Sequence, residues 1–398
     1  MAVNEDLQLP YTMDAHQLRN PYQARVLRTD VNRAIPSFIP EILDESVLAM
    51  NETFKNSIQE ETANIPVFDT MTHLIARISN RVIFGKELCR NEKFVHAIVR
   101  FAETTPLMAP FIQWSPLVFR PLVYFVLSSI LGGKKVALKF IIPYLKQYMK
   151  DRESMAEKPG LVSEYLIQGA PPDETVEGLA VRLLNVNFGS IHTSSIFITQ
   201  ALFEIALLSS KDIESMRTEV REALESEGGW TKGALDKLHK IDSALKEVGR
   251  YYGLMNFALP RVAVVGYDLE DGQNIPPGHR VAVDMRAIHF DARIYPEPNR
   301  CDLFRFANLR AQDGSDTAKY NFATLDSSYL PFGAGRHACA GRFFAAMELK
   351  LMLAHILLEY DISFPPPITQ RPKNLTFNGA IIPDPKAHLV FKPRKAKS

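Results

Sequence analysis

The chain has 398 residues, of which 46% are hydrophobic and 23% charged, as is usual for a globular protein with a substantial core. Its 46 Lys and Arg nearly balance its 45 Asp and Glu, so no charge excess favours nucleic acid as a partner. Three widely spaced cysteines argue against a disulfide framework, and none belongs to a CxxC pair typical of zinc sites. The first residues are polar and predict neither a signal peptide nor an anchor.

Helical periodicity dominates the first two thirds of the chain. It predicts helices over residues 39–54, 70–84, 92–102, 136–156, 175–208, 211–227 and 242–252. The most apolar stretch is 115–133, but its uninterrupted part has about half of the roughly 20 residues that a bilayer span needs. We therefore expect a buried or interfacial helix there.

After Pro260, apolar and polar residues alternate around DG and PPG turns, which predicts short antiparallel strands. A glycine-rich loop, a helix over 341–360 and a terminal hairpin over 376–392 complete the expected elements. The sequence therefore predicts a mainly α protein with a small β region. We expect one domain over 1–398, helix-rich in 1–259 and containing the strands in 260–398.

Three glycines and a cysteine stand close together in FGAGRHACAG, which ends at Gly341. Taken alone, Cys339 has three interpretations: a small buried hydrophobic residue, a nucleophile beside His337, or a thiolate ligand of a metal cofactor. Glycines let the backbone fold around the sulfur, and the following helix offers free N–H groups that stabilise negative charge. These features favour the ligand. A dinucleotide site is disfavoured, because no strand–helix–strand unit surrounds the motif.

Two further groups of residues stand out in the expected helices. In DSALKEVGR, Glu247 and Arg250 share a helix face, where a surface ion pair and a buried network are both open. In the longest expected helix, Gly189, Thr193 and neighbouring serines are weak helix formers whose hydroxyls can bond to helix carbonyls. A helix loosened in its middle often marks a functional site. His192, taken alone, is more typical of a satisfied core histidine.

Together these pieces resemble the cytochrome P450 superfamily. FGAGRHACAG matches its haem-binding signature FxxGxxxCxG, ALKEVGR carries its ExxR pair, and CDLFRF supplies a further arginine, Arg305. The resemblance covers nearly the whole chain, and LRNPYQARVLRTDVNRAIPSFIPEILDE is similar to fungal members that oxidise terpenoids and other secondary metabolites. It implies the cytochrome P450 fold, with Glu247, Arg250 and Arg305 as a structural network that supports the haem-side core.

The resemblance also implies which residues hold the cofactor, haem b. Cys339 would be the axial thiolate, a ligand that pushes electron density onto iron and favours O–O cleavage. Phe332 and Gly333 of the signature would lie at the haem, and Arg261 and His337 would hold its propionates through charge-assisted hydrogen bonds.

On the other side of the haem, the resemblance implies a catalytic role for the long helix. Thr193 occupies the position of the family's proton-delivering threonine, with His192 where an acidic residue is usual, and an imidazole can relay protons. The residues expected to contact the substrate are Asn185, Phe188, Gly189, Asn256, Phe257, Ala258, Ala380 and Ile381.

Full-length family members begin with a membrane anchor, two helices and the first strands of the β region. We therefore expect this chain to lack those parts, so that the strand sequences RVAVVGYDL and RVAVDM lack partners. Gly249 inside the ExxR helix adds a helix cost of about 1 kcal/mol. If an anchor precedes the chain, the expected location is the cytosolic face of the endoplasmic reticulum membrane, and otherwise contact would depend on residues 117–131.

The first interpretation of function is a haem-thiolate monooxygenase that oxidises a lipophilic secondary metabolite, a terpenoid or meroterpenoid intermediate, with O2. Electrons would come from NADPH–cytochrome P450 reductase, because the chain has no flavin or nicotinamide motif of its own. Two alternatives stay open: a non-catalytic truncated remnant, and an enzyme that uses the same haem for isomerisation or dehydration. The retained Thr193 disfavours the second alternative.

Overall fold

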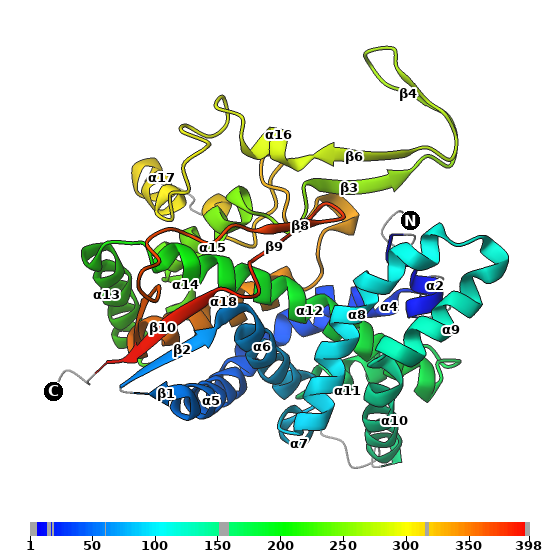
Figure 1. Cartoon of the computed structure of the whole chain (residues 1–398), viewed down its shortest axis with the longest axis horizontal. Coiled ribbons are helices and arrows are strands. Elements are labelled where there is room, and N and C mark those ends of the chain that lie inside the picture. The colour runs from blue at the N-terminus through cyan, green and yellow to red at the C-terminus, as the bar shows by residue number, and fades with distance from the viewer. Residues whose placement is uncertain are drawn as a thin grey trace.

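One long helix, α12 (Val176–Ile205), runs through the computed structural model, which describes residues 6–13, 17, 20–59, 61–150, 159–314 and 318–394 (Figure 1). The helices that pack most extensively on it are α6 (Val67–Ile83), α8 (Glu92–Trp114), α10 (Lys134–Lys150), α15 (His239–Tyr251) and α18 (Arg342–Glu359). This arrangement buries most of α12 and makes it one wall of the site described below.

The remaining helices surround this centre. They are α2 (Leu9–Thr12), α4 (Tyr22–Val26), η1 (Leu27–Val31), α5 (Asn32–Ser57), α7 (Lys86–Cys89), η2 (Leu117–Phe119), α9 (Arg120–Leu131), α11 (Val162–Gln168), α13 (Ser210–Glu227), α14 (Lys232–Asp236), α16 (Met285–His289), α17 (Arg305–Asp313), η4 (Ala318–Tyr320) and η5 (Gly335–His337). Polar side chains cap several of them, as when Thr175 accepts the Gly178 N–H at the start of α12.

The expected helices are found, with three differences. The helix expected over 92–102 continues to Trp114 through Pro106 and Pro110. The end of the helix expected over 136–156 falls in residues 151–156, outside the described part of the chain. The helix expected to loosen in its middle, α12, is continuous from Val176 to Ile205.

The largest sheet joins strands from residues 58–66 to strands near the C-terminus. Its strands are antiparallel in the order β1 (Ile58–Gln59), β2 (Thr62–Pro66), β10 (His388–Pro393) and β7 (Tyr360–Ser363). The terminal hairpin expected over 376–392 is therefore wrong in its second half: β8 (Leu375–Phe377) pairs with β9 (Ala380–Ile382), whereas β10 joins β2 and β7. The apolar side chains of Leu389 and Phe391 explain this, because both are fully buried in the core.

A second β region extends away from the helices (Figure 1). β3 (Phe257–Val262) pairs with β6 (Arg280–Asp284), and β4 (Tyr267–Asp268) pairs with β5 (Asn274–Ile275) around the DG turn. The expectation that these strand sequences lack partners is wrong, since they pair with each other. Val264 and Val265 at the outer end are 89% and 71% exposed.

The most apolar stretch forms η2 and α9 at the surface. No residue of α9 is buried, which contradicts the buried alternative and leaves the interfacial one. Trp114, Leu117 and Val118 beside it are 77%, 72% and 83% exposed. Among the described residues, none of the helices combines the length and the apolar composition required to cross a bilayer.

Candidate active site

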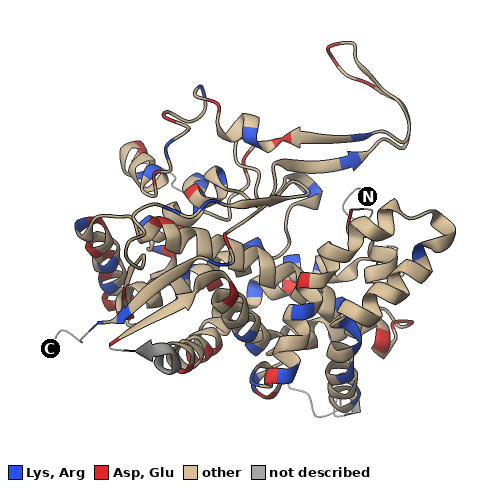
Figure 2. Cartoon of the chain, in the orientation of Figure 1, with Lys and Arg blue, Asp and Glu red and all other residues tan. Residues whose placement is uncertain are grey.

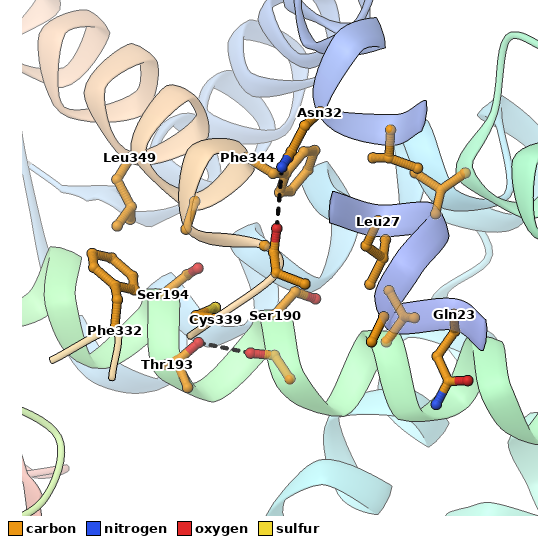
Figure 3. A pocket seen from close by; sticks show the side chains of 18 of the residues that line it. Gln23, Leu27, Asn32, Ser190, Thr193, Ser194, Phe332, Cys339, Phe344 and Leu349 are labelled. Carbon is orange, nitrogen blue, oxygen red and sulfur yellow. Dashed lines mark hydrogen bonds between the residues drawn. The ribbon is translucent and has the colours of Figure 1, made fainter. Parts of the chain in front are cut away.

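A cavity of about 430 Å³ lies between α12 and the loop that precedes α18 (Figure 3). The α12 wall consists of Asn185, Val186, Gly189, Ser190, Thr193, Ser194 and Phe197. The opposite wall consists of Pro331, Phe332, Cys339, Ala340, Gly341, Phe344, Ala345 and Leu349. The described residues of the lining are mostly apolar and include no charged side chain, which suits a large lipophilic occupant.

The loop that carries Cys339 is held by its own backbone. The Cys339 N–H donates to the carbonyl oxygen of Phe332 at 2.8 Å, which closes the loop. Gly333 and Gly335 have φ values of +70° and +61° in the left-handed region, where a side chain costs free energy. Two glycines of the motif are thus explained by the shape of the loop.

The Cys339 sulfur lies at the wall of the cavity. Its side chain is accessible from the cavity, whereas protein surrounds it on the other sides, and this burial raises the pKa of the thiol. The backbone N–H groups of Gly341 and Arg342 and the charge of Arg342 act in the opposite direction and lower that pKa. These donors at the start of α18 favour a negatively charged sulfur.

Two further glycines leave open space on opposite walls of the cavity. Neither Gly189 of α12 nor Gly341 at the start of α18 has an atom within 4 Å of the place where a Cβ would stand. Both residues line the cavity, so a side chain at either would narrow it. The space between them and beside Cys339 fits a flat group such as haem.

Hydroxyl groups of α12 bond back to the helix instead of breaking it. Thr193 Oγ1 donates to the carbonyl oxygen of Gly189 at 2.7 Å, and Ser195 Oγ donates to that of Ile191 at 2.6 Å. The weak helix formers are therefore compatible with a continuous helix, because tertiary packing stabilises it. Thr193 lines the cavity across from the Cys339 loop (Figure 3).

His192 lies next to Thr193 in sequence but does not line this cavity. Its ring hydrogen-bonds to the backbone of Ala102 in α8, and its Nε2 has no hydrogen-bond partner among the described residues. Burial lowers the pKa of His192 to about 4, so the ring is neutral at neutral pH.

The residues expected to hold the propionates also lie outside the cavity lining. Arg261 is exposed on β3 and donates from Nη1 to the carbonyl oxygen of Pro260 at 2.9 Å. His337 is exposed in η5, within the Cys339 loop. Phe332 does line the cavity, where it stacks on Phe197 with ring centroids 6.1 Å apart.

The expected substrate contacts divide into two groups. Asn185 and Gly189 line the cavity, whereas Phe188 packs against Phe101 with ring centroids 6.2 Å apart. The other five expected residues are Asn256, Phe257, Ala258, Ala380 and Ile381, and none of them lines this cavity.

The two segments that carry those five residues nevertheless meet beside one lining residue, Leu254. The Ile381 N–H donates to the carbonyl oxygen of Leu254 at 3.0 Å, and the Asn256 N–H donates to that of Gly379 at 2.9 Å. The segment before β3 and the β8–β9 hairpin therefore lie side by side at the edge of the site.

A third wall, which the sequence analysis missed, comes from α4, η1 and the start of α5. Its lining residues are Gln23, Ala24, Leu27, Val31 and Asn32. Asn32 Nδ2 donates to the carbonyl oxygen of Ala340 at 3.4 Å across 308 positions of sequence. No short motif marks these residues, so only the folded chain brings them to the Cys339 loop.

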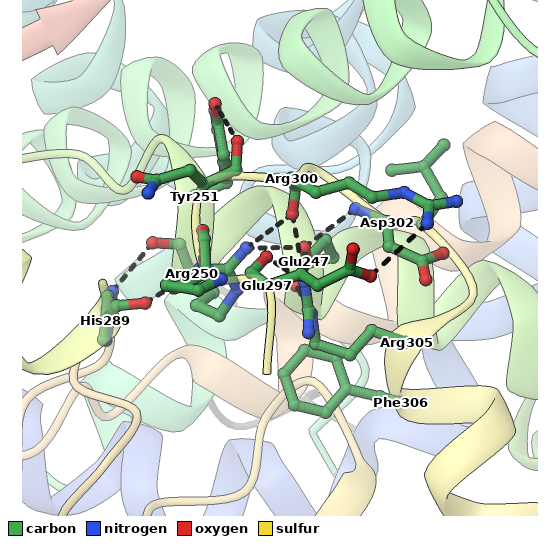
Figure 4. Close-up of polar contacts among 12 residues, drawn as sticks. Glu247, Arg250, Tyr251, His289, Glu297, Arg300, Asp302, Arg305 and Phe306 are labelled. Atoms are coloured by element: carbon green, nitrogen blue, oxygen red, sulfur yellow. Dashed lines mark hydrogen bonds and ion pairs between the residues drawn. The ribbon is translucent and has the colours of Figure 1, made fainter. Parts of the chain in front are cut away.

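Behind the site, Glu247, Arg250 and Arg305 form a buried network (Figure 4). Arg250 donates from Nε to Oε2 of Glu247 at 2.8 Å and from Nη2 to Oε1 at 2.7 Å. Arg305 Nε lies 3.2 Å from Oε1 and 3.1 Å from Oε2. The Asp302 N–H adds a further donor to Glu247 at 2.9 Å. Of the two arrangements that the ExxR spacing left open, the structure shows the buried network.

Both arginines also bind the chain that leads to α17. Arg250 Nη1 donates to the carbonyl oxygens of His289 and Pro298, at 2.8 and 2.9 Å. Arg305 Nη1 donates to that of Pro296 at 2.6 Å. The network therefore fastens the irregular segment after α16 to α15.

Close packing explains why a glycine stands at position 249 of the same helix. A Cβ at this position would lie inside contact distance of the Tyr329 hydroxyl and 3.1 Å from Cε1 of Phe197. Because Gly249 has no side chain, Tyr329, which precedes the Cys339 loop, and Phe197 on α12 can approach the helix closely. This packing offsets the unfavourable helix propensity of glycine.

Comparisons with known proteins agree with this architecture. The family model described as Cytochrome P450 matches residues 10–391. The cytochrome P450 monooxygenase olcJ of Penicillium canescens is 32% identical over 96% of this chain and 72% of its own. Cytochrome P450 monooxygenase 103 of Postia placenta is 30% identical over 98% and 78%. Ent-kaurene oxidase P450-4 of Gibberella fujikuroi is 29% identical over 97% and 77%.

A solved structure supports the fold independently of close sequence similarity. The heme domain of cytochrome P450DA superposes with a TM-score of 0.71 at 18% identity, over 94% of this chain and 77% of that one. The fold and the enzyme class expected from the signature are thus confirmed. Because the family model covers nearly its whole length, the chain belongs to the cytochrome P450 family and is a P450 monooxygenase.

Proposed function

We propose that this monooxygenase binds haem b through the thiolate of Cys339 and oxidises a lipophilic secondary metabolite, a terpenoid or meroterpenoid intermediate. The observation that carries the proposal is the cavity between Gly189 and Gly341, with the Cys339 sulfur at its wall and the backbone N–H groups of Gly341 and Arg342 opposing the rise in the pKa of its thiol. When bound, haem supplies the activation of O2, from which one atom enters a C–H bond of the substrate and the other becomes water.

The chain's own residues prepare this chemistry. The N–H groups of Gly341 and Arg342 stabilise the Cys339 sulfur as an anion, and the apolar walls exclude water. Thr193 Oγ1 donates its hydrogen bond to the Gly189 carbonyl oxygen, so its lone pairs are left to accept a hydrogen bond in the cavity. We infer that Thr193 handles protons at the site, with more support than His192, whose ring faces Ala102.

Two observations support the substrate class. The cavity lining is predominantly apolar, with amide and hydroxyl groups as its polar members. Relatives include an ent-kaurene oxidase, whose name refers to a diterpene. We propose NADPH–cytochrome P450 reductase as the electron donor, because no flavin or nicotinamide motif is found in the sequence.

We also propose that the protein works at the cytosolic face of the endoplasmic reticulum membrane. The support is the exposed apolar surface of η2 and α9. Figure 2 shows no red segment, and therefore no acidic residue, on α9. Residues 104–150 around it contain no Asp or Glu. The basic residues of this stretch are Arg120, Lys134, Lys135, Lys139, Lys146 and Lys150. An exposed apolar helix whose neighbours in sequence carry only positive charge suits an anionic lipid surface.

NADPH-dependent formation of an oxygenated product tests the function. The purified, haem-loaded chain is mixed with the reductase, NADPH and a panel of terpenoids, and products are analysed by mass spectrometry. We expect NADPH-dependent gain of one oxygen atom in a product. A product formed without NADPH would instead indicate isomerisation or dehydration, and a chain that takes up no haem would be a non-catalytic remnant.

A further inference from the structure

Arg182 of α12 is fully buried, and its contacts converge on the start of α4. Nε and Nη2 both lie 2.9 Å from Oε2 of Glu174, whose side chain is 2% exposed. Nη1 donates to the carbonyl oxygen of Asn20 at 2.7 Å and to Oε1 of Gln23 at 2.6 Å. The guanidinium also lies 4.5 Å from the ring centroid of Tyr22. A buried charge with this many contacts has one position.

These contacts fix which way the Gln23 amide points. A guanidinium can only donate hydrogen bonds, so the oxygen of the amide must face Arg182. The amide nitrogen, Nε2, is then turned away, and it has no hydrogen-bond partner among the residues that the structure describes. Gln23 lines the cavity, where it projects toward α12 (Figure 3). The Gln23 amide is thus a donor of fixed orientation on a residue that lines the cavity.

The other polar groups in the lining differ from this donor. Asn185 Nδ2 donates to Oε1 of Gln17 at 3.3 Å, but two amides in contact can turn over together and exchange donor for acceptor. The hydroxyls of Ser190 and Thr193 donate to carbonyls of their own helix. The orientation of Gln23 is set by a partner that cannot reverse its role.

We propose that Gln23 is a specificity-determining residue, which donates from Nε2 to an acceptor oxygen of the molecule bound in the cavity. Arg182 is the positioning residue that keeps this donor in place. The inference rests on the proposed function, since it requires a haem-loaded cavity. The acceptor oxygen has two possible sources, a haem propionate or a carbonyl or hydroxyl group of the substrate, and the experiment separates them.

The sharpest variant is Gln23→Glu. It keeps an oxygen for Arg182 and replaces the N–H donor with an oxygen, so that an acceptor is repelled where it was bound. Gln23→Met removes the amide at nearly unchanged length. The matched control is Gln168→Glu, the same change at an exposed position at the end of α11.

The first arm measures haem retention, as the rate of haem transfer to apomyoglobin. If the acceptor is a propionate, Gln23→Met speeds transfer about tenfold, the worth of one buried hydrogen bond. Gln23→Glu then speeds it more, and Gln168→Glu leaves it unchanged.

The second arm uses two probes that bind haem iron through the same imidazole nitrogen, 1-phenylimidazole and 4′-(imidazol-1-yl)acetophenone. They differ by one acetyl oxygen acceptor, and their dissociation constants are read from the shift of the Soret band. If the acceptor belongs to the substrate, both Gln23 variants lower the affinity for the acetyl probe relative to the plain probe, about tenfold. Haem retention then stays unchanged.

Arg182→Lys tests the positioning role, because an ammonium cannot reproduce the fork that holds Glu174 and Gln23 together. Its effect in whichever arm responds should disappear when Gln23→Met is already present. A purely structural role would add to that variant instead. If neither arm responds to Gln23→Glu, the inference is overturned. A failure of the proposed function is distinguishable, because the wild-type chain itself would then bind no haem.

Discussion

Cys339 and Cys301 carry the same thiol in opposite surroundings. Burial raises the pKa of both, but beside Cys301 the carboxylates of Glu204 and Glu247 add to the rise and outrank the opposing charges of Arg250 and Arg371. Beside Cys339, two backbone N–H groups and the Arg342 charge oppose it. The difference shows that burial alone does not make a ligand. Donors directed at the sulfur distinguish the region built for a thiolate from the region built for structure.

The largest loss of stability is expected when a charge is removed from the buried network of Glu247 and Arg250, which lies beside Cys301. Arg250→Ala leaves the Glu247 carboxylate buried without its strongest partner, so we expect a loss of about 3–5 kcal/mol in the free energy of unfolding. Urea unfolding measures this. The control is Arg300→Ala, whose ion pair with Glu297 is exposed, and which should cost less than about 1 kcal/mol. Equal effects of the two variants would contradict the importance of the buried network.

A smaller loss of stability is expected at Gly249, where the helix of Glu247 and Arg250 contacts the segment that leads to Cys339. Gly249→Ala adds a methyl group against the Tyr329 hydroxyl and the Phe197 ring, and overpacking of this kind costs about 1–3 kcal/mol. Thermal unfolding of Gly249→Ala, Tyr329→Phe and the double variant measures it. Removing the hydroxyl should recover part of the loss. Simple additivity of the two changes would mean that the clash is not the cause.

The helix that follows Cys339 contains a carboxyl group whose titration can be measured. Glu348 is fully buried, with Oε1 accepting from Ser79 at 2.6 Å, and burial raises its pKa to about 8. The folded chain therefore holds a proton that the unfolded chain releases near 4.5. The resulting stabilisation is complete below that pH and is lost as the pH rises toward 8.

Glu348→Gln removes this titration and keeps an acceptor for Ser79. Stability of the wild-type chain should therefore fall more steeply between pH 5 and pH 8 than stability of the variant. Urea midpoints at several pH values give the difference, which isolates Glu348 from other groups that titrate in the same range. Parallel curves for the two proteins would show that Glu348 is ionised in the fold.

The smallest expected effect is that of Cys301→Ser. The thiol has no ligand role in this account, and the substitution is nearly isosteric, so haem content and the carbon monoxide spectrum should be unchanged. A spectral change in this variant would contradict the view that Cys301 has no role in binding haem.

Local signals made part of the fold and site predictable. The Cys339 loop, the helix after it and the ExxR helix are each specified by neighbouring residues, and the resemblance of their motifs to the cytochrome P450 family pointed to haem. Interactions between distant segments were not predictable. Gln23 and Asn32 reach the cavity only through tertiary packing, and β10 takes β2 as its neighbour although more than 300 residues separate them. Helix periodicity also could not show that α9 stays exposed, since an apolar helix is equally typical of a core.

The most direct test of the central claim is the difference spectrum of the reduced chain with carbon monoxide, recorded for wild type, Cys339→Ser and Cys301→Ser. We predict a strongly red-shifted Soret band, typical of thiolate-bound haem, in the wild type and in Cys301→Ser. The band should be absent from Cys339→Ser. A red-shifted band that survives in Cys339→Ser, or one that disappears in Cys301→Ser, would contradict the assignment of Cys339 as the ligand.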